Sequence, residues 1–170
     1  MNHRIIQATN TEQLEAIEQL AEQIWHEHYT PIIGREQVLY MLDKFQSLPA
    51  MRQQITQDGY HYYSLLVDNQ LKGYFAIQVK PQVVFLSKLY VTSELRGRGY
   101  GKRCLDYIKT LAADTGRILI ELTVNKYNAN SIAAYQSMGF EIIKEAVFDI
   151  GQGYVMDDYV MQLVINPAQS

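Results

Sequence analysis

The sequence predicts an α/β protein in which helices flank a mixed sheet. Three observations lead to this prediction. Apolar runs typical of strands alternate along the chain with segments of helical periodicity. A glycine-rich loop at residues 96–101 joins a strand-like run to an amphipathic helix. The length of 170 residues and the 48% of apolar residues suit one core, so we expect a single domain over residues 1–170.

The first half of the chain begins with a strand at residues 4–8. Thr11 is expected to cap a helix running to about Tyr29, because apolar residues recur there at helical spacing. Two shorter helices are expected at residues 37–45 and 50–57, separated by a Ser-Leu-Pro sequence. A hairpin then follows, with strands at residues 60–67 and 71–79.

The second half starts with a strand at residues 83–91 that enters the glycine loop. A long helix at residues 100–114 follows and is expected to end at Thr115 and Gly116. The remaining expected elements are a strand at 117–124, a short helix at 131–138 and two final strands at 141–150 and 154–165.

Composition and charge exclude several classes of protein. The net charge of −3 argues against a general nucleic-acid binder. The chain has neither a signal-like N-terminus nor a run of 18 apolar residues, so we expect a cytoplasmic protein that does not enter a membrane. The single cysteine, Cys104, excludes an internal disulfide and is expected to be a buried thiol. His26 and His28 are two residues apart, which on a helix separates their side chains, so no metal site is expected.

The loop itself has the features of a phosphate-binding loop. Its alternating glycines let a ligand approach the backbone closely. The helix that follows directs its unpaired N–H groups and positive dipole end toward the loop. Arg96, Arg98 and Lys102 add the charge that a pyrophosphate attracts.

Two common glycine-loop signatures are absent. The P-loop pattern needs four residues between its glycines and Lys-Ser/Thr at its end, but Gly97 and Gly101 are separated by three and Lys102 precedes an arginine. A dinucleotide fingerprint lacks its last glycine. Glu121 does lie about 20 residues on, where that fold places a ribose-binding acid, so a nucleotide-binding domain stays the alternative.

The pattern Arg96-x-x-Gly99-x-Gly101 resembles the acetyl-coenzyme A loop of the GNAT acetyltransferases. A second segment, from Asn128 through Tyr135 to Gly139 and Phe140, resembles the second signature of that family. Physical reasoning places a short helix there, with Asn128 or Asn130 as its N-cap and Gly139 as its stop. The two motifs occur in the family's order.

The resemblance implies a mostly antiparallel sheet whose fourth and fifth strands splay apart, with the cofactor in the gap. The main chain of Leu89 and Val91 would pair with the pantetheine arm of acetyl-CoA. Asn128 would contact the cofactor, and Tyr135 would stand near its sulfur. The pyrophosphate would be held by the amides of the loop residues Arg96, Gly97, Arg98, Gly99, Tyr100, Gly101 and Lys102.

The expected reaction is attack of an amine on the thioester carbonyl. The Val91 N–H would polarise this carbonyl, and Tyr135 would protonate the departing thiolate. Many members of the family place a glutamate on the fourth strand, but this chain has only Ser87 and Lys88 there. The general base is therefore open between a chain of water molecules and several residues: Glu27, His26, His28, Glu94 and Glu121.

The acceptor pocket is expected to involve the end of the first helix, with Trp25, Glu27 and Tyr29 as candidate substrate contacts. Asp157 and Asp158 are either solvated hairpin charges or ligands for an ammonium group.

Three functions follow from these residues. The first is acetyl-CoA-dependent N-acetylation of a small primary amine such as a polyamine. The alternatives are acetylation of a protein N-terminus or lysine, and a non-catalytic acyl-CoA sensor. The final strands are compatible with a homodimer.

Overall fold

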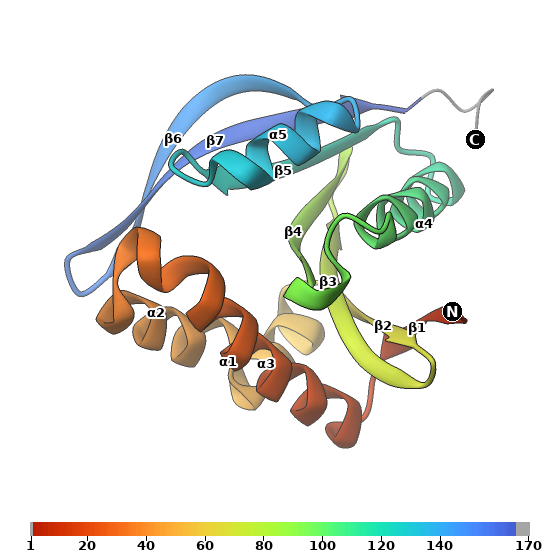
Figure 1. The fold of residues 1–170 in the computed structure, drawn as a ribbon. Helices are drawn as coiled ribbons and strands as arrows, with labels where there is room; N and C mark the ends of the chain where they lie inside the picture. The colour runs from red at the N-terminus through yellow and green to blue at the C-terminus, as the bar shows by residue number, and fades with distance from the viewer. Residues whose placement is uncertain (1, 166–170) are drawn as a thin grey trace. The chain divides into compact units, whose positions relative to one another are not determined.

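The computed structural model describes residues 2–165. The chain forms two compact units: unit 1 comprises residues 1–78 and 88–105, and unit 2 comprises residues 79–87 and 106–170. Seven strands follow the order β1-β2-β3-β4-β5-β7-β6 (Figure 1). Four of the described strand pairs are antiparallel, and β4 pairs with β5 in parallel. The predicted mixed, mostly antiparallel sheet is therefore confirmed.

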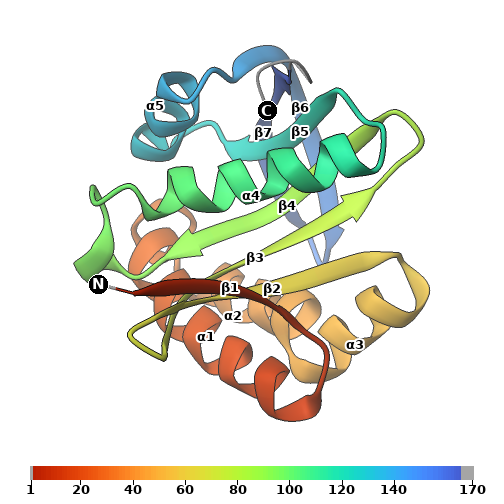
Figure 2. The ribbon, with the colours of Figure 1, turned by 90° about the vertical axis from the view of Figure 1, so that its right-hand side faces the viewer.

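Unit 1 contains the first three strands and three helices. The strands are β1 (His3–Ala8), β2 (Tyr60–Val67) and β3 (Gln70–Val79). The helices are α1 (Thr11–Ile33), α2 (Arg35–Met41) and α3 (Leu48–Gln57), with a π-helical turn at Leu42–Gln46. These helices lie on one side of β1 and β2 (Figure 2), and α3 packs against both α1 and β2.

The start and end of α1 differ from the prediction. Asn10, not Thr11, is the N-cap, because its Oδ1 accepts the Gln13 N–H at 2.8 Å and the Gln13 side chain accepts the Asn10 N–H in return. The helix continues past Tyr29 and includes Pro31, which sits in its last turn. Gly34, with φ of 86°, then ends it.

The predicted helix at 37–45 is wrong in its bounds. α2 begins at Arg35, and the segment after Met41 is a π-helical turn. The predicted break before the next helix is confirmed at Ser47, whose hydroxyl accepts the Ala50 N–H at 3.3 Å.

A hydrogen-bonded chain of buried polar side chains crosses the core of unit 1. The Trp25 indole donates to the Tyr74 hydroxyl at 3.0 Å, and that hydroxyl donates to Gln46 Oε1 at 2.6 Å. Gln46 Nε2 donates to the Tyr62 hydroxyl, which donates to Gln54 Oε1. Buried polar side chains that are all hydrogen-bonded favour a single arrangement of the core. This hydrogen-bond network therefore holds the Trp25 ring against the sheet.

Strand β4 (Val83–Val91) leads into a 3₁₀ turn at Ser93–Leu95 and then α4 (Tyr100–Asp114). A Cβ at Gly73 would lie 2.7 Å from the Tyr90 carbonyl oxygen, so glycine lets β3 approach the end of β4. The Thr92 N–H also donates to the Lys72 carbonyl at 2.9 Å. These contacts set the backbone position where β4 ends.

Unit 2 contains β5 (Leu119–Asn125), β6 (Glu141–Gly151) and β7 (Tyr154–Val164), with α5 (Ala129–Ser137) between β5 and β6. The parallel pairing of β4 with β5 runs from Val83–Leu119 to Leu86–Leu122. β7 lies between β5 and β6 and is antiparallel to both (Figure 1).

Two elements of unit 2 start at residues other than the predicted ones, and the ends of β5, α5, β6 and β7 each differ by one residue. β5 begins two residues later than expected, after the helix stop at Gly116, which has φ of 77°. α5 begins at Ala129, two residues before the expected start, because Asn128 is the cap. Among residues 2–165, no helix combines the length and apolar composition needed to span a bilayer.

Candidate functional site

The glycine loop has the conformation that its sequence predicts. Gly97 and Gly99 have φ of 76° and 84°, values that side-chain-bearing residues rarely adopt. Arg96, Arg98 and Lys102 are exposed. Because α4 begins directly after Gly99, its first N–H groups and its positive dipole end lie beside these cations.

Gly101 tests whether the loop suits a phosphate ligand. It lies in the first turn of α4, and a Cβ built there would meet nothing within 4 Å. The protein's own packing therefore does not require glycine at this position. Backbone left open at a helix N-terminus among three exposed cations fits an anionic group that approaches closely.

The Tyr100 side chain is buried, unlike the exposed loop residues 96–99 that precede it. It packs edge-on against His3 and lies under the Arg103 guanidinium at 5.4 Å. The ring anchors the start of α4, so only the main chain of Tyr100 remains available for the predicted ligand contact. Cys104, one turn later, is also buried, and burial raises the pKa of its thiol to about 12.

An aromatic cluster forms where α1 meets the end of β4, within unit 1. The Tyr29 and Tyr90 hydroxyl oxygens are 2.8 Å apart. The Trp25 ring packs against both tyrosines, with centroids 5.4 and 5.8 Å away. Trp25 itself is buried, so it cannot make the predicted direct substrate contact. Its ring packs against Tyr29 and supports the position of that side chain.

His28 belongs to the same cluster. Its ring centroid lies 5.2 Å from that of Tyr29 and 6.4 Å from that of Tyr90, edge-on in both cases. Burial and, secondly, the positive charge of Arg96 lower the pKa of His28. The imidazole is therefore neutral at physiological pH.

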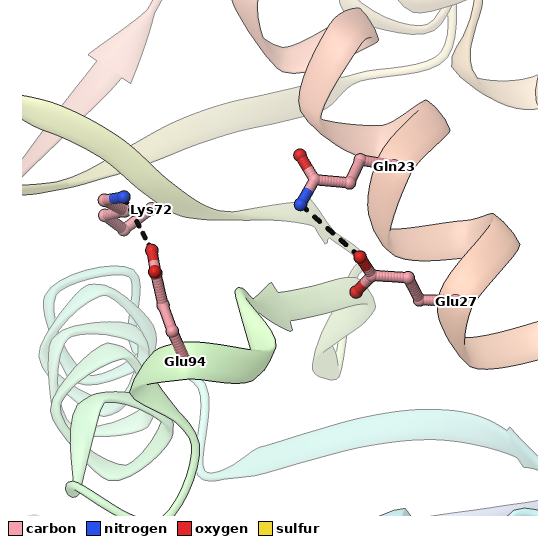
Figure 3. A network of polar contacts seen from close by, with 4 residues as sticks. All are labelled: Gln23, Glu27, Lys72 and Glu94. Carbon is pink, nitrogen blue, oxygen red and sulfur yellow. Dashed lines mark hydrogen bonds and ion pairs between the residues drawn. The ribbon is translucent and has the colours of Figure 1, made fainter.

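Two of the carboxylates considered as bases, Glu27 and Glu94, have polar side-chain partners of their own (Figure 3). Glu27 is exposed and accepts a 3.5 Å hydrogen bond from Gln23, one turn earlier on α1. Glu94 binds the Lys72 ammonium at 2.6 Å, and this hydrogen bond lowers the pKa of its carboxyl. The predicted substrate contact of Glu27 has no support from its surroundings.

Lys88 is half-buried on β4, two residues before Tyr90 and on the same face of the strand. Its ammonium lies 5.3 Å from the Tyr60 ring centroid and 5.7 Å from that of Tyr62. Burial lowers the pKa of Lys88 to about 7. A lysine thus occupies the strand on which a glutamate base was sought.

The second motif lies in unit 2. Asn128 is buried and caps α5, since its Oδ1 accepts the Ser131 N–H at 3.3 Å. Tyr135 is half-buried, and its ring packs edge-on against Phe140 with centroids 5.5 Å apart. The structure therefore confirms the cap and the helix, while the contacts of both side chains with the cofactor stay predictions.

Asp157 is held by a lysine. The Lys126 ammonium lies 2.8 Å from Asp157 Oδ1 and 3.3 Å from Glu145 Oε1, and these carboxylates raise the pKa of the lysine. Lys126 also donates its backbone N–H to the Asp157 carbonyl at 3.1 Å. This ion pair satisfies Asp157, which makes it a poor ligand for an external ammonium.

Asp158 is in the opposite situation. Asp158 is 1% exposed, and neither carboxylate oxygen has a partner with good hydrogen-bond geometry among residues 2–165, although the Thr123 side chain lies close enough to favour the ionised form. Burial, followed by the charge of Asp157, raises the pKa of Asp158 to about 6, while Thr123 and Lys126 oppose this shift. Asp158 pairs in register with Asn125, the last residue of β5. Unsatisfied buried carboxylates are costly and mark candidate sites for a cation.

These residues fall in two groups, one in each unit. Unit 1 holds the loop, the end of β4, and the cluster of Trp25, His28, Tyr29 and Tyr90. Unit 2 holds Asn128, Tyr135 and the aspartates. Among residues 2–165, no three His, Cys, Asp or Glu side chains are grouped as metal ligands would be.

Residues 14–140 match the model of the acetyltransferase (GNAT) family. The chain belongs to the GNAT family. Its curated relatives are also named as N-acetyltransferases, which makes this GNAT protein an acyltransferase. An uncharacterized N-acetyltransferase of Lactobacillus delbrueckii subsp. lactis is 23% identical over 68% of this chain and 72% of its own length. One from Mycobacterium bovis is 26% identical over 77% of this chain and 84% of its own length.

Solved structures share the GNAT fold. The PaiA N-acetyltransferase of Thermoplasma acidophilum, solved in complex with coenzyme A, matches with a TM-score of 0.80 and 18% identity over 96% of this chain and 99% of that one. The ribosomal-protein-S18-alanine N-acetyltransferase of Escherichia coli matches with a TM-score of 0.69 and 19% identity over 97% of this chain and 95% of that one.

Sequence reasoning missed two residues that shape this GNAT site. Tyr90 is one: the same strand alternation that exposes Leu89 and Val91 to one face places Tyr90 on the other, toward α1. Gly73 is the second, and a glycine inside a strand pattern is a signal of close backbone approach.

Proposed function

We propose that this GNAT protein transfers the acetyl group of acetyl-CoA to the primary amine of a small cationic molecule, such as a polyamine, with residues 1–170 working as one catalytic domain. The amides and cations of residues 96–102 hold the pyrophosphate, and the main chain of Leu89 and Val91 pairs with the pantetheine. Gly101 supports this assignment, because no packing contact within the protein requires a glycine there, whereas a phosphate that approaches the backbone does.

The single observation behind the choice of acceptor is Asp158. A buried carboxylate without a well-formed hydrogen bond is unfavourable, and a primary ammonium would supply both the charge and the donors that it lacks. Asp158 also lies opposite Asn125, at the end of β5, one of the two strands between which the family resemblance places the cofactor. Asp157 is already bound to Lys126, so the two neighbouring aspartates are not equivalent.

The reaction is direct attack of the amine nitrogen on the thioester carbonyl. The Val91 N–H polarises that carbonyl, a type of contact that contributes about 3 kcal/mol at the transition state. The C–S bond breaks as the amide forms, and Tyr135 protonates the departing thiolate.

The test measures binding and turnover separately. Acetyl-CoA at 100 times its Kd should stabilise the protein by about 2.7 kcal/mol, a shift of roughly 5 to 10 °C in Tm, while NAD and ATP should not. Thiol release is then followed with diamines, neutral alkylamine analogues, N-terminal peptides and lysine peptides.

Diamines should be the preferred acceptors, and Asp158→Asn should raise KM for them while Asp157→Asn does not. Preference for peptides would favour the protein acetyltransferase, and binding without thiol release from any acceptor would favour the acyl-CoA sensor. A shift with NAD or ATP alone would refute the acetyltransferase proposal.

A further inference from the structure

Three of the carboxylates considered as a general base have polar side-chain partners of their own, and Asp158 is assigned to the acceptor ammonium. Glu94 is paired with Lys72, and Glu27 lies on the exposed side of α1 beside Gln23. In unit 2, Glu121 accepts a 2.9 Å hydrogen bond from Gln162. The base must therefore be sought among other groups near the end of β4.

His28 meets the geometric requirements in unit 1. It lies beside Tyr90, the residue between Leu89 and Val91, whose backbone is proposed to hold the pantetheine. It also lies within the electrostatic influence of Arg96, the first residue of the phosphate loop. Tyr29 from its own helix and Tyr90 from β4 face its ring, and the charge of Arg96 from the loop acts on it.

The surroundings also fix the ring in place. The paired hydroxyls of Tyr29 and Tyr90 tie α1 to β4, and Trp25 packs against both rings. Trp25 is in turn held by the Tyr74 hydroxyl. General bases act well when positioned and when their pKa lies near the working pH, and burial beside a cation keeps this imidazole unprotonated.

We propose that His28 is the general base that removes the proton from the attacking nitrogen, with Tyr29 and Tyr90 as the residues that position it. This inference rests on the proposed N-acetyltransferase function. The acceptor ammonium first loses one proton to water. As the C–N bond forms, the nitrogen becomes acidic and its proton passes to the imidazole. The C–S bond breaks, the thiolate takes up a proton, and the imidazolium later releases its own to solvent.

The decisive measurement is the pH dependence of kcat/KM for a diamine, followed by thiol release. The wild type needs a neutral amine, a neutral His28 and an ionised Asp158, so log kcat/KM should be steeper by one unit of slope below the His28 pKa, in addition to the contributions of the amine and of Asp158. His28→Ala should lose this one unit of slope, lose roughly 10²- to 10⁴-fold in rate at pH 7.5, and regain part of the rate with added imidazole.

His61→Ala is the control, since His61 is an exposed histidine on β2 whose ring contacts the Gln7 side chain. Its rate and profile should equal those of the wild type. Tyr29→Phe and Tyr90→Phe should reduce kcat more than they raise KM. His28→Gln serves as a second variant if the alanine protein unfolds.

A readout independent of activity is the NMR titration of the histidine ring protons. The resonance lost in His28→Ala should have the lowest pKa of the set, and Arg96→Ala should raise it. A wild-type rate in His28→Ala, or a pH slope as steep as that of the wild type, would overturn the base assignment alone. Absence of acetyl transfer by the wild-type protein would instead remove the proposed function.

Discussion

Asp157 and Asp158 are consecutive in β7 but have opposite environments. Asp157 is bound to Lys126 at 2.8 Å, whereas Asp158 is buried without a partner of good hydrogen-bond geometry among residues 2–165. Successive side chains of a strand point to opposite faces, which separates the two carboxylates. With Asp158 as the proposed ligand of the acceptor ammonium, stability and ligand binding oppose each other at this residue.

Asp158→Asn should therefore stabilise the free protein above about pH 6. The folded-state pKa of Asp158 is raised from 3.8 to about 6, so the stability of the neutral form is complete below pH 3.8 and is lost as the pH rises through 6. Ionisation of the buried carboxyl lowers the free energy of unfolding by about 3 kcal/mol at most. Asp158→Asn recovers only part of this amount, because burial of the polar amide also has a cost. Urea unfolding at pH 4 and pH 7.5 checks this. Asp157→Asn is the control, because it breaks the Lys126 ion pair and should give no gain.

Tyr135→Phe should lower turnover by roughly one to three decades, because a positioned proton donor for the thiolate is lost. The Kd for acetyl-CoA should stay within about tenfold of the wild-type value. The Tm should stay close to that of the wild type, because the ring contact with Phe140 does not need the hydroxyl. Steady-state kinetics with a calorimetric Kd separate the two effects. Turnover equal to the wild type would assign Tyr135 to packing.

Gly99→Ala should weaken acetyl-CoA binding, and this effect should exceed that of an equally strained alanine elsewhere in the protein. Gly59 provides a matched control: both glycines have positive φ, at 84° and 74°, and neither has an atom within 4 Å of an added Cβ. Both alanine variants should lose about 1 kcal/mol of stability from backbone strain. Only the loop variant should also raise the Kd for acetyl-CoA, by roughly tenfold. Equal affinities in both would argue against the loop as the phosphate site.

Lys88→Met should stabilise the protein at neutral pH. Because the folded-state pKa of Lys88 is lowered from 10.5 to about 7, the penalty of burying its charge is complete below pH 7 and disappears as the pH rises to 10.5. The expected gain is roughly 2 to 4 kcal/mol at pH 6.5, shrinking toward zero near pH 10.5.

Lys44→Met is the control for this prediction, since the Lys44 ammonium also lies over aromatic rings, those of Tyr40 and Phe45 at 5.6 Å, but is exposed. It should change stability by less than about 0.5 kcal/mol at either pH. Parallel pH dependence in both variants would show that Lys88 is not desolvated.

The sequence alone determined the order of elements, the glycine loop and the family. These features depend on local chemistry: glycines with positive φ, a helix that starts beside cations, and the Asn128 cap are all encoded within a few residues. The errors lay at helix boundaries such as Asn10 and Arg35, where several residues of similar propensity compete and capping geometry decides.

Only the tertiary structure distinguished residues of the same type. Asp157 and Asp158 look alike in sequence, but burial and the Lys126 ion pair separate them. His26 and His28 also look alike, and the ring contact with Tyr90 distinguishes His28. Lys126 comes to Asp157 from the end of β5, and Tyr90 comes to His28 from β4. Charge state depends on desolvation and on neighbours across the fold, which local sequence patterns do not contain.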